Sequence, residues 1–440
     1  MSGGNAVTGD DAVSGDDVVS GGEGAGPVEV QVRAVASGGD GVAELPDGKV
    51  VFVPRTAPGD RALVTVQERH SSWARATVDR LLEGGERRVP PPCPLFDRCG
   101  GCQIQHLAYD AQLEWKGRFV VDALERIGKL SDVPEPEVVP SPRTEGYRTR
   151  MTFTLRRLRG GRVVAGLHAL DNPAHVIDIH DQCLLPEAPV LEAWVGLREG
   201  WGGGARRLPD GGRMRLTLRE APEGIELVVD GGAPGWRSGG LMDEVPSLTG
   251  IWHRPSGADE TVLVAGESRP GGGDAFEQVN PAGAALLRDH VLEMARRGAC
   301  DTVVEAYCGT AAVGRSLADG GARVAGVERN ASAVAAARLE APETLTVVEG
   351  AVEDHLADLL PSDLLLVNPP RTGLDDAIPE TIRRGPPDRL IYVSCDPATL
   401  ARDVKRMGDT FRLTDLRCFD LFPHTAHVET VAVLQRQEAT

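Results

Sequence analysis

Two short segments near the C-terminus hold side chains that suit covalent and acid–base chemistry. Cys395 lies within residues 394–397 (Ser-Cys-Asp-Pro), after an apolar run and before a helical pattern. A helix N-terminus lowers the pKa of a thiol and favours the nucleophilic thiolate, so we expect Cys395 to be reactive. Glu429 begins a strand pattern that is otherwise apolar. Such an acid is either a salt-bridge partner or a general base whose pKa is set by burial, and spacing does not decide between the two.

A second group of residues is typical of a site for an adenosine-containing cofactor. Residues 305–314 (Glu-Ala-Tyr-Cys-Gly-Thr-Ala-Ala-Val-Gly) follow a pattern of strand, tight turn and helix. Small residues such as Gly309 let a ligand approach the backbone, and Glu328, at the end of the next strand, can accept hydrogen bonds from ribose hydroxyls. This pattern alone also fits a dinucleotide fold. Residues 368–371 (Asn-Pro-Pro-Arg) favour a methyltransferase because they resemble the active-site loop of class I methyltransferases, although two prolines also fit a simple turn.

A cysteine cluster indicates a metal centre. Cys93, Cys99 and Cys102 lie within ten residues, and a fourth candidate, Cys183, follows much later in the chain. Four thiolates can hold an iron–sulfur cluster or a tetrahedral zinc ion. Zinc is the commoner choice on chemistry alone, but structural zinc sites usually pair their ligands closely in sequence, which the distant Cys183 does not. Eight cysteines in 440 residues are too few for a disulfide scaffold.

The elements that position these residues are clearest after residue 273. Continuous apolar strands alternate with helices, which predicts a doubly wound α/β fold with a parallel sheet covered on both faces. The carboxyl ends of its strands would bring the cysteine, the acid and the cofactor loops to one edge. The predicted strands are residues 302–305, 323–328, 345–348, 364–367 and 390–393, and the first predicted helices are 312–318 and 332–339.

Three regions precede this domain. Residues 1–26 are rich in Gly, Ser and Asp without periodicity, which predicts a disordered tail. Residues 27–88 alternate apolar and polar residues between Gly- and Pro-containing turns, which predicts a small OB-like β-barrel. Residues 89–272 form a mixed α+β central domain with the cysteine cluster and a helix from Tyr109 to about Lys129. The domain with the cofactor loops then spans residues 273–440.

Taken together, four segments resemble the uridine-C5 RNA methyltransferase family, which is a class I, S-adenosylmethionine-dependent family. They are residues 276–280, 368–371, 394–397 and 427–430. The resemblance extends over essentially everything after residue 27, where the barrel resembles a TRAM domain. It implies an enzyme in which Cys395 adds to C6 of uridine and Glu429 removes the C5 proton. It also implies cofactor contacts from Gln278, Tyr307, Gly309, Glu328 and Asn368.

The resemblance extends to the cysteines and to an arginine-rich segment. The spacing of Cys93, Cys99, Cys102 and Cys183 is similar to the [4Fe–4S] site of TRAM-bearing members, so we favour that cluster over zinc. Residues 143–162 contain seven arginines and one acid. Arginines beside an aromatic residue suit contacts to phosphates and unstacked bases, although a solvated strand face has the same pattern. The predicted RNA-binding residues are Tyr147, Arg148, Arg150 and Arg371.

Two positions depart from the family pattern. Asn368 replaces the usual Asp, and Ala311 replaces a usual second Gly, where its methyl group could crowd the cofactor. Because of these departures, two alternatives stay open: a methyltransferase of the same fold that acts on another base or on transfer RNA, and a catalytically silent RNA-binding protein.

Composition restricts the setting. The formal net charge of −18 argues against a general nucleic-acid coat protein, but it is compatible with an enzyme that has a local basic face. No apolar run approaches the length of a membrane-spanning helix, and the N-terminus has no export signal. We expect a cytoplasmic monomer whose partner is RNA, with large-subunit ribosomal RNA favoured over transfer RNA by the resemblance.

Overall fold

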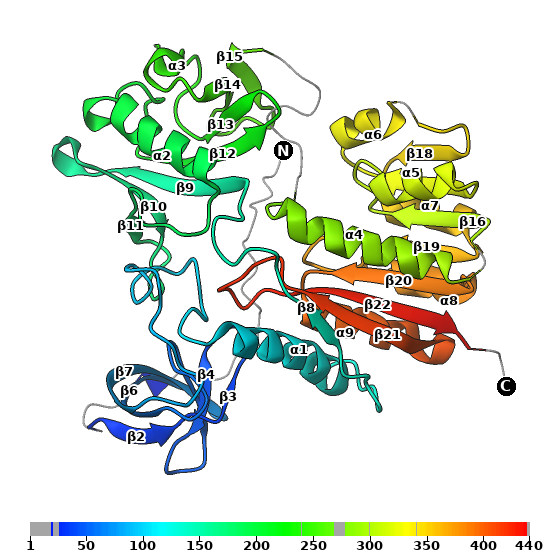
Figure 1. Cartoon of the computed structure of the whole chain (residues 1–440), viewed down its shortest axis with the longest axis horizontal. Coiled ribbons are helices and arrows are strands. Elements are labelled where there is room, and N and C mark those ends of the chain that lie inside the picture. The colour runs from blue at the N-terminus through cyan, green and yellow to red at the C-terminus, as the bar shows by residue number, and fades with distance from the viewer. Residues whose placement is uncertain are drawn as a thin grey trace. The chain divides into compact units, whose positions relative to one another are not determined.

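The computed structural model describes residues 19–20, 26–238, 240–267, 278–298, 300–339 and 341–437. The chain forms two compact units (Figure 1). One comprises Met1–Pro90 and His106–Ala108, and the other comprises Pro91–Gln105 and Tyr109–Thr440. The predicted disordered tail lies almost wholly outside the described residues.

The first unit is the predicted small β-structure. Its strands follow the order β1-β6-β7-β5-β4-β3, and β2 also pairs with β6. Alternating residues of these strands, such as Val30, Val51 and Val64, are buried in one apolar core. The strands are β1 (Val19–Ser20), β2 (Val28–Gln31), β3 (Ala34–Val35), β4 (Gly41–Glu44), β5 (Val50–Val53), β6 (Arg61–Arg69) and β7 (Trp73–Glu83).

The second unit contains two sheets. The central one has the order β11-β10-β9-β12-β13-β14-β15 and is covered by α2, whose Trp194 stacks on Phe153 with ring centroids 3.9 Å apart. This agrees with the predicted mixed α+β region. Its elements are β9 (Arg150–Arg157), β10 (Val163–His168), β11 (Val176–Asp178), α2 (Ala188–Gly200), β12 (Arg213–Ala221), β13 (Gly224–Asp230), α3 (Leu241–Glu244), β14 (Leu248–Arg254) and β15 (Val262–Gly266).

The other sheet is the predicted doubly wound one, with the order β18-β17-β16-β19-β20-β22-β21-β8. Strands β16 to β20 are mutually parallel, and β22 is antiparallel to its neighbours. The strands are β8 (Glu137–Val139), β16 (Thr302–Ala306), β17 (Arg323–Glu328), β18 (Leu345–Glu349), β19 (Leu364–Val367), β20 (Arg389–Ser394), β21 (Phe411–Phe419) and β22 (Glu429–Arg436).

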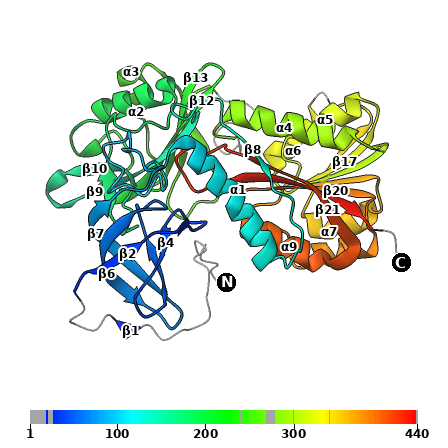
Figure 2. The ribbon, with the colours of Figure 1, turned by 60° about the horizontal axis from the view of Figure 1, so that its bottom comes forward.

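Helices cover both faces of this sheet, as Figure 2 shows. One face packs against α4 (Pro281–Arg296), α5 (Ala312–Asp319) and α6 (Ala331–Arg338). The opposite face packs against α1 (Tyr109–Arg126), α7 (Val352–Leu359), α8 (Ile378–Arg384) and α9 (Pro397–Met407). No helix among the described residues is long and apolar enough to cross a membrane.

Residues 109–139 pack with the doubly wound sheet and not with the central sheet that follows them in the sequence. They fall within the predicted central domain, yet α1 packs against α9 and β8 pairs in parallel with β21 at the sheet edge. The reason is the apolar stripe of α1, whose Val120 and Leu124 are fully buried in the core under the doubly wound sheet.

Candidate active site and cysteine centre

The doubly wound sheet reverses its strand order at its centre. From β16 the chain runs outward to β17 and β18 on one side, and it resumes on the other side at β19. Such a switch point leaves a crevice at the carboxyl ends of the two central strands. Here the backbone N–H of Asn368 donates to the carbonyl of Ala306 at 3.4 Å, so the two predicted cofactor loops lie side by side.

The loop after β16 is shaped by two residues with left-handed backbone and by one acid. Tyr307 has φ 60° and Ala311 has φ 52°. The Glu328 carboxylate accepts hydrogen bonds from the backbone N–H of Gly309 at 2.9 Å and from that of Asn330 at 2.7 Å. Because two carboxylate oxygens have about four acceptor sites, this acid can still bind a ribose hydroxyl. The structure therefore brings Tyr307, Gly309 and Glu328 together.

The sequence left open whether the methyl group of Ala311 crowds the cofactor. This side chain has no exposed surface and packs in the apolar core beneath α5. The methyl group is therefore packed inside the protein, which argues against crowding of the cofactor. Asn368, in contrast, is exposed at the end of β19. No side chain among the described residues forms a hydrogen bond with its carboxamide.

The predicted nucleophile and base lie opposite each other on neighbouring antiparallel strands. Ser394 pairs with Thr430 at the end of β20, so the register places Cys395 opposite Glu429. Asp396 caps α9 by accepting hydrogen bonds from two backbone N–H groups at 2.9 Å, which fixes the turn directly after the cysteine. The Glu429 side chain is only 6 % exposed. Among the described residues, no group forms a hydrogen bond or ion pair with its carboxylate, which favours a base over a structural acid.

Electrostatics modify the expectation for Cys395. Burial, followed by the neighbouring Glu429, raises the pKa of the Cys395 thiol, while Arg371 opposes the rise. Burial and the nearby acid therefore act against the lowering of the pKa that the helix N-terminus predicts. Burial also raises the pKa of Glu429 to about 7, and Arg371 again opposes the rise. Arg371 is thus the cation that both groups share.

Among the described residues, the side chain of Gln278 forms no hydrogen bond, but the two residues that follow it do. The next residue, Val279, accepts a hydrogen bond at its carbonyl from the backbone N–H of Thr149 at 2.9 Å. Asn280 then caps α4 and donates to the carbonyl of Leu421 at 3.1 Å. The segment is therefore anchored beside the loop that leads to Glu429. Phe276 and Glu277, which carried part of the resemblance, lie outside the described residues.

Sequence reasoning missed Asp403, a buried acid on α9 that supports the loop after β19. Its carboxylate accepts hydrogen bonds from the backbone N–H of Leu374 at 2.7 Å and from the Tyr392 hydroxyl at 2.8 Å. Arg402 contacts the same carboxylate at 2.9 Å and also donates to the carbonyl of Thr372. The sequence shows that Asp403 lies on the helix after Cys395. It does not show that this helix packs against the loop after β19, so the role of Asp403 could not be predicted.

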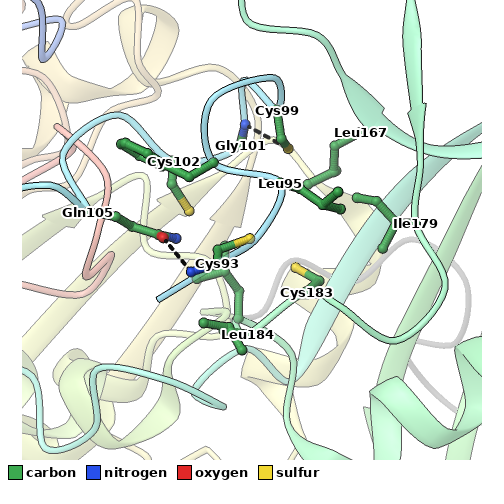
Figure 3. Close-up of a pocket in the computed structure, with 12 residues that line it drawn as sticks. Cys93, Leu95, Cys99, Gly101, Cys102, Gln105, Leu167, Ile179, Cys183 and Leu184 are labelled. Carbon is green, nitrogen blue, oxygen red and sulfur yellow. Dashed lines mark hydrogen bonds between the residues drawn. The ribbon is translucent and has the colours of Figure 1, made fainter. Parts of the chain in front are cut away.

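The four predicted cluster ligands surround one cavity in the second unit. Figure 3 shows the sulfur atoms of Cys93, Cys99, Cys102 and Cys183 turned toward one space. The rest of the lining is apolar apart from Gln105 and Gly101, and it includes Leu95, Phe96, Leu167, Ile179, Leu184 and Leu185. Burial raises the pKa of Cys102 to about 12 and that of Cys183 to about 11. The fold thus brings together cysteines that are far apart in the sequence.

Two glycines allow this loop to turn. A Cβ on Gly101 would lie 2.8 Å from Cδ1 of Leu167, and its N–H donates to Sγ of Cys99 at 3.4 Å. A Cβ on Gly100 would lie 3.2 Å from the carbonyl oxygen of Ala169. Four thiols within apolar walls have the donor chemistry of an iron–sulfur cluster or of zinc. Within the described residues, however, no group of three or more Cys, His, Asp or Glu side chains is arranged to hold a single metal ion, so the positions of the thiols do not support zinc.

A hollow of about 270 Å³ lies next to this centre. It is lined by Arg148 and Arg150 together with Gly101, Met151, Thr152, Leu167, Leu185 and Val279. The Arg148 guanidinium lies 5.8 Å from the ring centroid of Tyr147 and 5.7 Å from that of Phe422. Its Nε is buried without a hydrogen-bond partner. These two arginines therefore present positive charge to a space open to solvent.

Other members of the arginine segment have structural roles. Arg157 donates to five carbonyl groups between Gly204 and Gly211, and Arg143 pairs with Glu187 at 3.5 Å. Tyr147 is only 2 % exposed, and its hydroxyl donates to the carbonyl of Pro423. The prediction that Tyr147 contacts RNA is therefore wrong, because a buried ring cannot stack on a base.

The doubly wound sheet and the loops at its switch point are typical of a class I methyltransferase. The family model described as tRNA (uracil-5-)-methyltransferase matches residues 355–437, and the TRAM domain model matches residues 27–78. RNA methyltransferases of Gloeobacter violaceus and Halalkalibacterium halodurans are 33% and 32% identical to this chain, over 93% of it and 96% of each relative. The chain belongs to the uracil-C5 RNA methyltransferase family.

A solved structure supports the same conclusion. The Pyrococcus abyssi tRNA (uracil-54, C5)-methyltransferase in complex with S-adenosyl-L-homocysteine is 26% identical, with a TM-score of 0.67. The match covers 92% of this chain and 100% of that one. The resemblance drawn from the sequence is thus confirmed for the family, the TRAM domain, the enzyme class and S-adenosylmethionine.

Proposed function

We propose that this enzyme methylates C5 of a uridine in RNA through a covalent bond between Cys395 and C6 of the base. The observation that supports the proposal is the register of β20 and β22, which sets Cys395 opposite Glu429 at the edge of the sheet where we expect the cofactor loops. A nucleophile and a buried acid on facing strands are the two groups that this reaction requires.

The reaction assigns a separate step to each residue. The Cys395 thiolate adds to C6, which makes C5 electron-rich enough to take a methyl group. S-adenosylmethionine supplies that methyl group when it is bound. Glu429 then removes the proton from C5, the C5–C6 double bond forms again, and Cys395 leaves as a thiolate. A carboxylate with a pKa near neutrality is well matched to this proton transfer.

We assign the cofactor contacts to the residues around the switch point. Glu328 is the ribose acceptor, Tyr307 and Gly309 form the loop below the adenosine, and Gln278 approaches from the start of α4. We place Asn368, which is exposed at the end of β19, between the cofactor and the base. Its carboxamide can accept one hydrogen bond and donate another, which suits the N3–H and O4 groups of uracil.

We propose that Arg148, Arg150 and Arg371 contact the phosphates of the RNA backbone. The first two line the open hollow beside the active-site loop, and Arg371 is exposed after β19. A target carbon inside a base stack is unreachable, so the uridine must be flipped out, and arginines at the rim would hold the flanking phosphates.

We propose a [4Fe–4S] cluster for the four cysteines, with zinc as the alternative. The support is the common direction of their sulfur atoms into one apolar cavity and the wide sequence separation of Cys183. Such a centre would have a structural role, since methyl transfer requires no redox step.

For the substrate we favour large-subunit ribosomal RNA, on the resemblance to TRAM-bearing members. Transfer RNA is the second candidate because the Pyrococcus abyssi enzyme, with its similar fold, acts on transfer RNA.

The test is to incubate the protein and S-adenosylmethionine with ribosomal and transfer RNA that contain 5-fluorouridine. Fluorine cannot leave as a proton does, so the reaction should stop at a covalent adduct that survives a denaturing gel. The adduct should disappear in Cys395→Ala and persist in Cys300→Ala, a half-buried cysteine away from the site. Mapping the adduct identifies the RNA. Methyl transfer to natural RNA without any adduct would contradict the covalent mechanism.

A further inference from the structure

The segment that leads to Glu429 is held almost entirely by residues from outside the catalytic sheet. Between β21 and β22 the chain passes through residues 420–428. Lys116 of α1 pairs with Asp420 at 2.5 Å and donates to the carbonyl of Phe422 at 3.0 Å. The carboxamide oxygen of Gln112 accepts from the N–H of His424 at 3.0 Å. His424 has φ 69°, a left-handed conformation that is uncommon for residues other than glycine, and these contacts stabilise it.

The cysteine loop supplies the contacts nearest to the base. The backbone N–H groups of Gln103 and Ile104 both donate to the carbonyl of His424, at 3.0 and 3.1 Å. The side-chain oxygen of Gln103 accepts from the N–H of Ala426 at 3.4 Å. Ala426 lies three residues before Glu429, so this is the last side-chain contact before the base that comes from the cysteine loop.

The same carboxamide is also tied to the cysteine cluster. The Nε2 of Gln103 donates to the carbonyl of Gly100 at 2.8 Å, and the neighbouring Gly101 donates to Sγ of Cys99. Cys102 directly precedes Gln103 in the chain. One side chain therefore connects the turn that carries two cysteines to the segment that carries the base.

We propose that Gln103 is a positioning residue for Glu429, and that through it the folded cysteine loop sets the alignment of the base for removal of the C5 proton. This inference rests on the proposed covalent mechanism. The Glu429 carboxylate takes the proton from C5, the electron pair forms the C5–C6 double bond, and the bond from C6 to Cys395 breaks. Addition of Cys395 to C6 needs no proton removal from C5, so it should tolerate a displaced Glu429.

The test separates these two steps. Gln103→Leu keeps the volume and removes both hydrogen bonds, and Gln103→Glu keeps the acceptor for Ala426. With 5-fluorouridine RNA, Gln103→Leu should form the adduct within about threefold of the wild-type rate. With natural uridine RNA and S-adenosylmethionine, it should release product at least about tenfold more slowly and accumulate a covalent complex of protein and RNA. Gln103→Glu should recover part of the release rate.

The matched control is Gln182→Ala. This glutamine precedes the cluster ligand Cys183, and its side chain accepts a hydrogen bond within its own turn, from the N–H of His180. It should behave as wild type in both assays. Iron and sulfide per chain should be equal in all variants, which shows that the cysteine centre is intact.

Hydrogen exchange gives a readout that does not depend on activity. Peptides that cover residues 420–428 should exchange faster in Gln103→Leu and at the wild-type rate in Gln182→Ala. Parallel loss of adduct formation and release, or unchanged exchange in Gln103→Leu, would overturn the proposal. Absence of a 5-fluorouridine adduct in the wild type would instead count against the covalent mechanism, and exchange of this segment would still decide whether Gln103 holds it.

Discussion

At the residue scale, the active site places one cation beside two groups that must both lose a proton. Arg371 opposes the rise in pKa that burial imposes on Cys395 and on Glu429. Replacing it with Ala should move both titrations to higher pH. At pH 7 the thiolate fraction, and with it the rate of 5-fluorouridine adduct formation, should fall by about tenfold for every unit by which the thiol pKa rises. The whole profile of adduct rate against pH should therefore shift to higher pH in Arg371→Ala. An unshifted profile with a lower rate at every pH would show that Arg371 only contacts RNA.

The ionised carboxylate of Glu429 is needed for activity but lowers the stability of the folded protein. Its pKa is raised from 4.5 to about 7 in the folded protein, so the folded state retains a proton that the unfolded state releases. This group therefore lowers stability as pH rises from 4.5 to 7, by up to about 3 kcal/mol. Glu429→Gln should release no product, yet unfold at a higher temperature than wild type at pH 8. The gap should narrow toward pH 5 in thermal scans, and a constant gap would contradict the raised pKa.

At the scale of one element, α9 links the nucleophile to the loop after β19. Its N-terminus follows Cys395, and Asp403 in its interior holds Leu374 and Tyr392. Asp403→Asn removes the charge that Arg402 and Arg406 share, and it should cost about 2–4 kcal/mol of unfolding free energy in urea titrations. Asp409→Asn, in the exposed turn after the helix, is the control and should change stability by less than about 0.5 kcal/mol. Equal effects would mean that Asp403 has no special role.

At the scale of the whole molecule, a net charge of −18 repels RNA, so we expect RNA binding to depend on a few local arginines. Binding should therefore weaken steeply with salt. Arg148→Gln should lower the slope of log affinity against log salt by about 0.7 for one contact to single-stranded RNA. Arg159→Gln, in the exposed turn between β9 and β10, should leave the slope unchanged. Fluorescence titrations at several salt concentrations measure both slopes, and an unchanged slope in Arg148→Gln would remove it from the RNA site.

Much of the catalytic sheet was predictable from the sequence because its strands are continuous apolar runs. Predicted strands 323–328 and 364–367 agree with the structure at both ends. The pairing of Cys395 with Glu429 followed only from the resemblance. The contacts that hold the segment before Glu429 were not predictable. The link from Lys116 to Asp420 and the contacts of Gln103 join segments more than three hundred residues apart, and no local pattern carries such information. Tyr147 was misread because a pattern of residue types does not reveal burial.

The place of α1 and β8 has a consequence for dissecting the chain. Both elements come before the central sheet in the sequence, yet they complete one face and one edge of the sheet that carries the active site. A fragment that starts at residue 273 would expose the apolar surface that Val120 and Leu124 cover and leave β21 with an open edge. The domain boundary predicted at residue 273 is therefore unsuitable for a truncation. The catalytic half of this enzyme is not a detachable module, and any minimal version must retain residues 109–139 beside it.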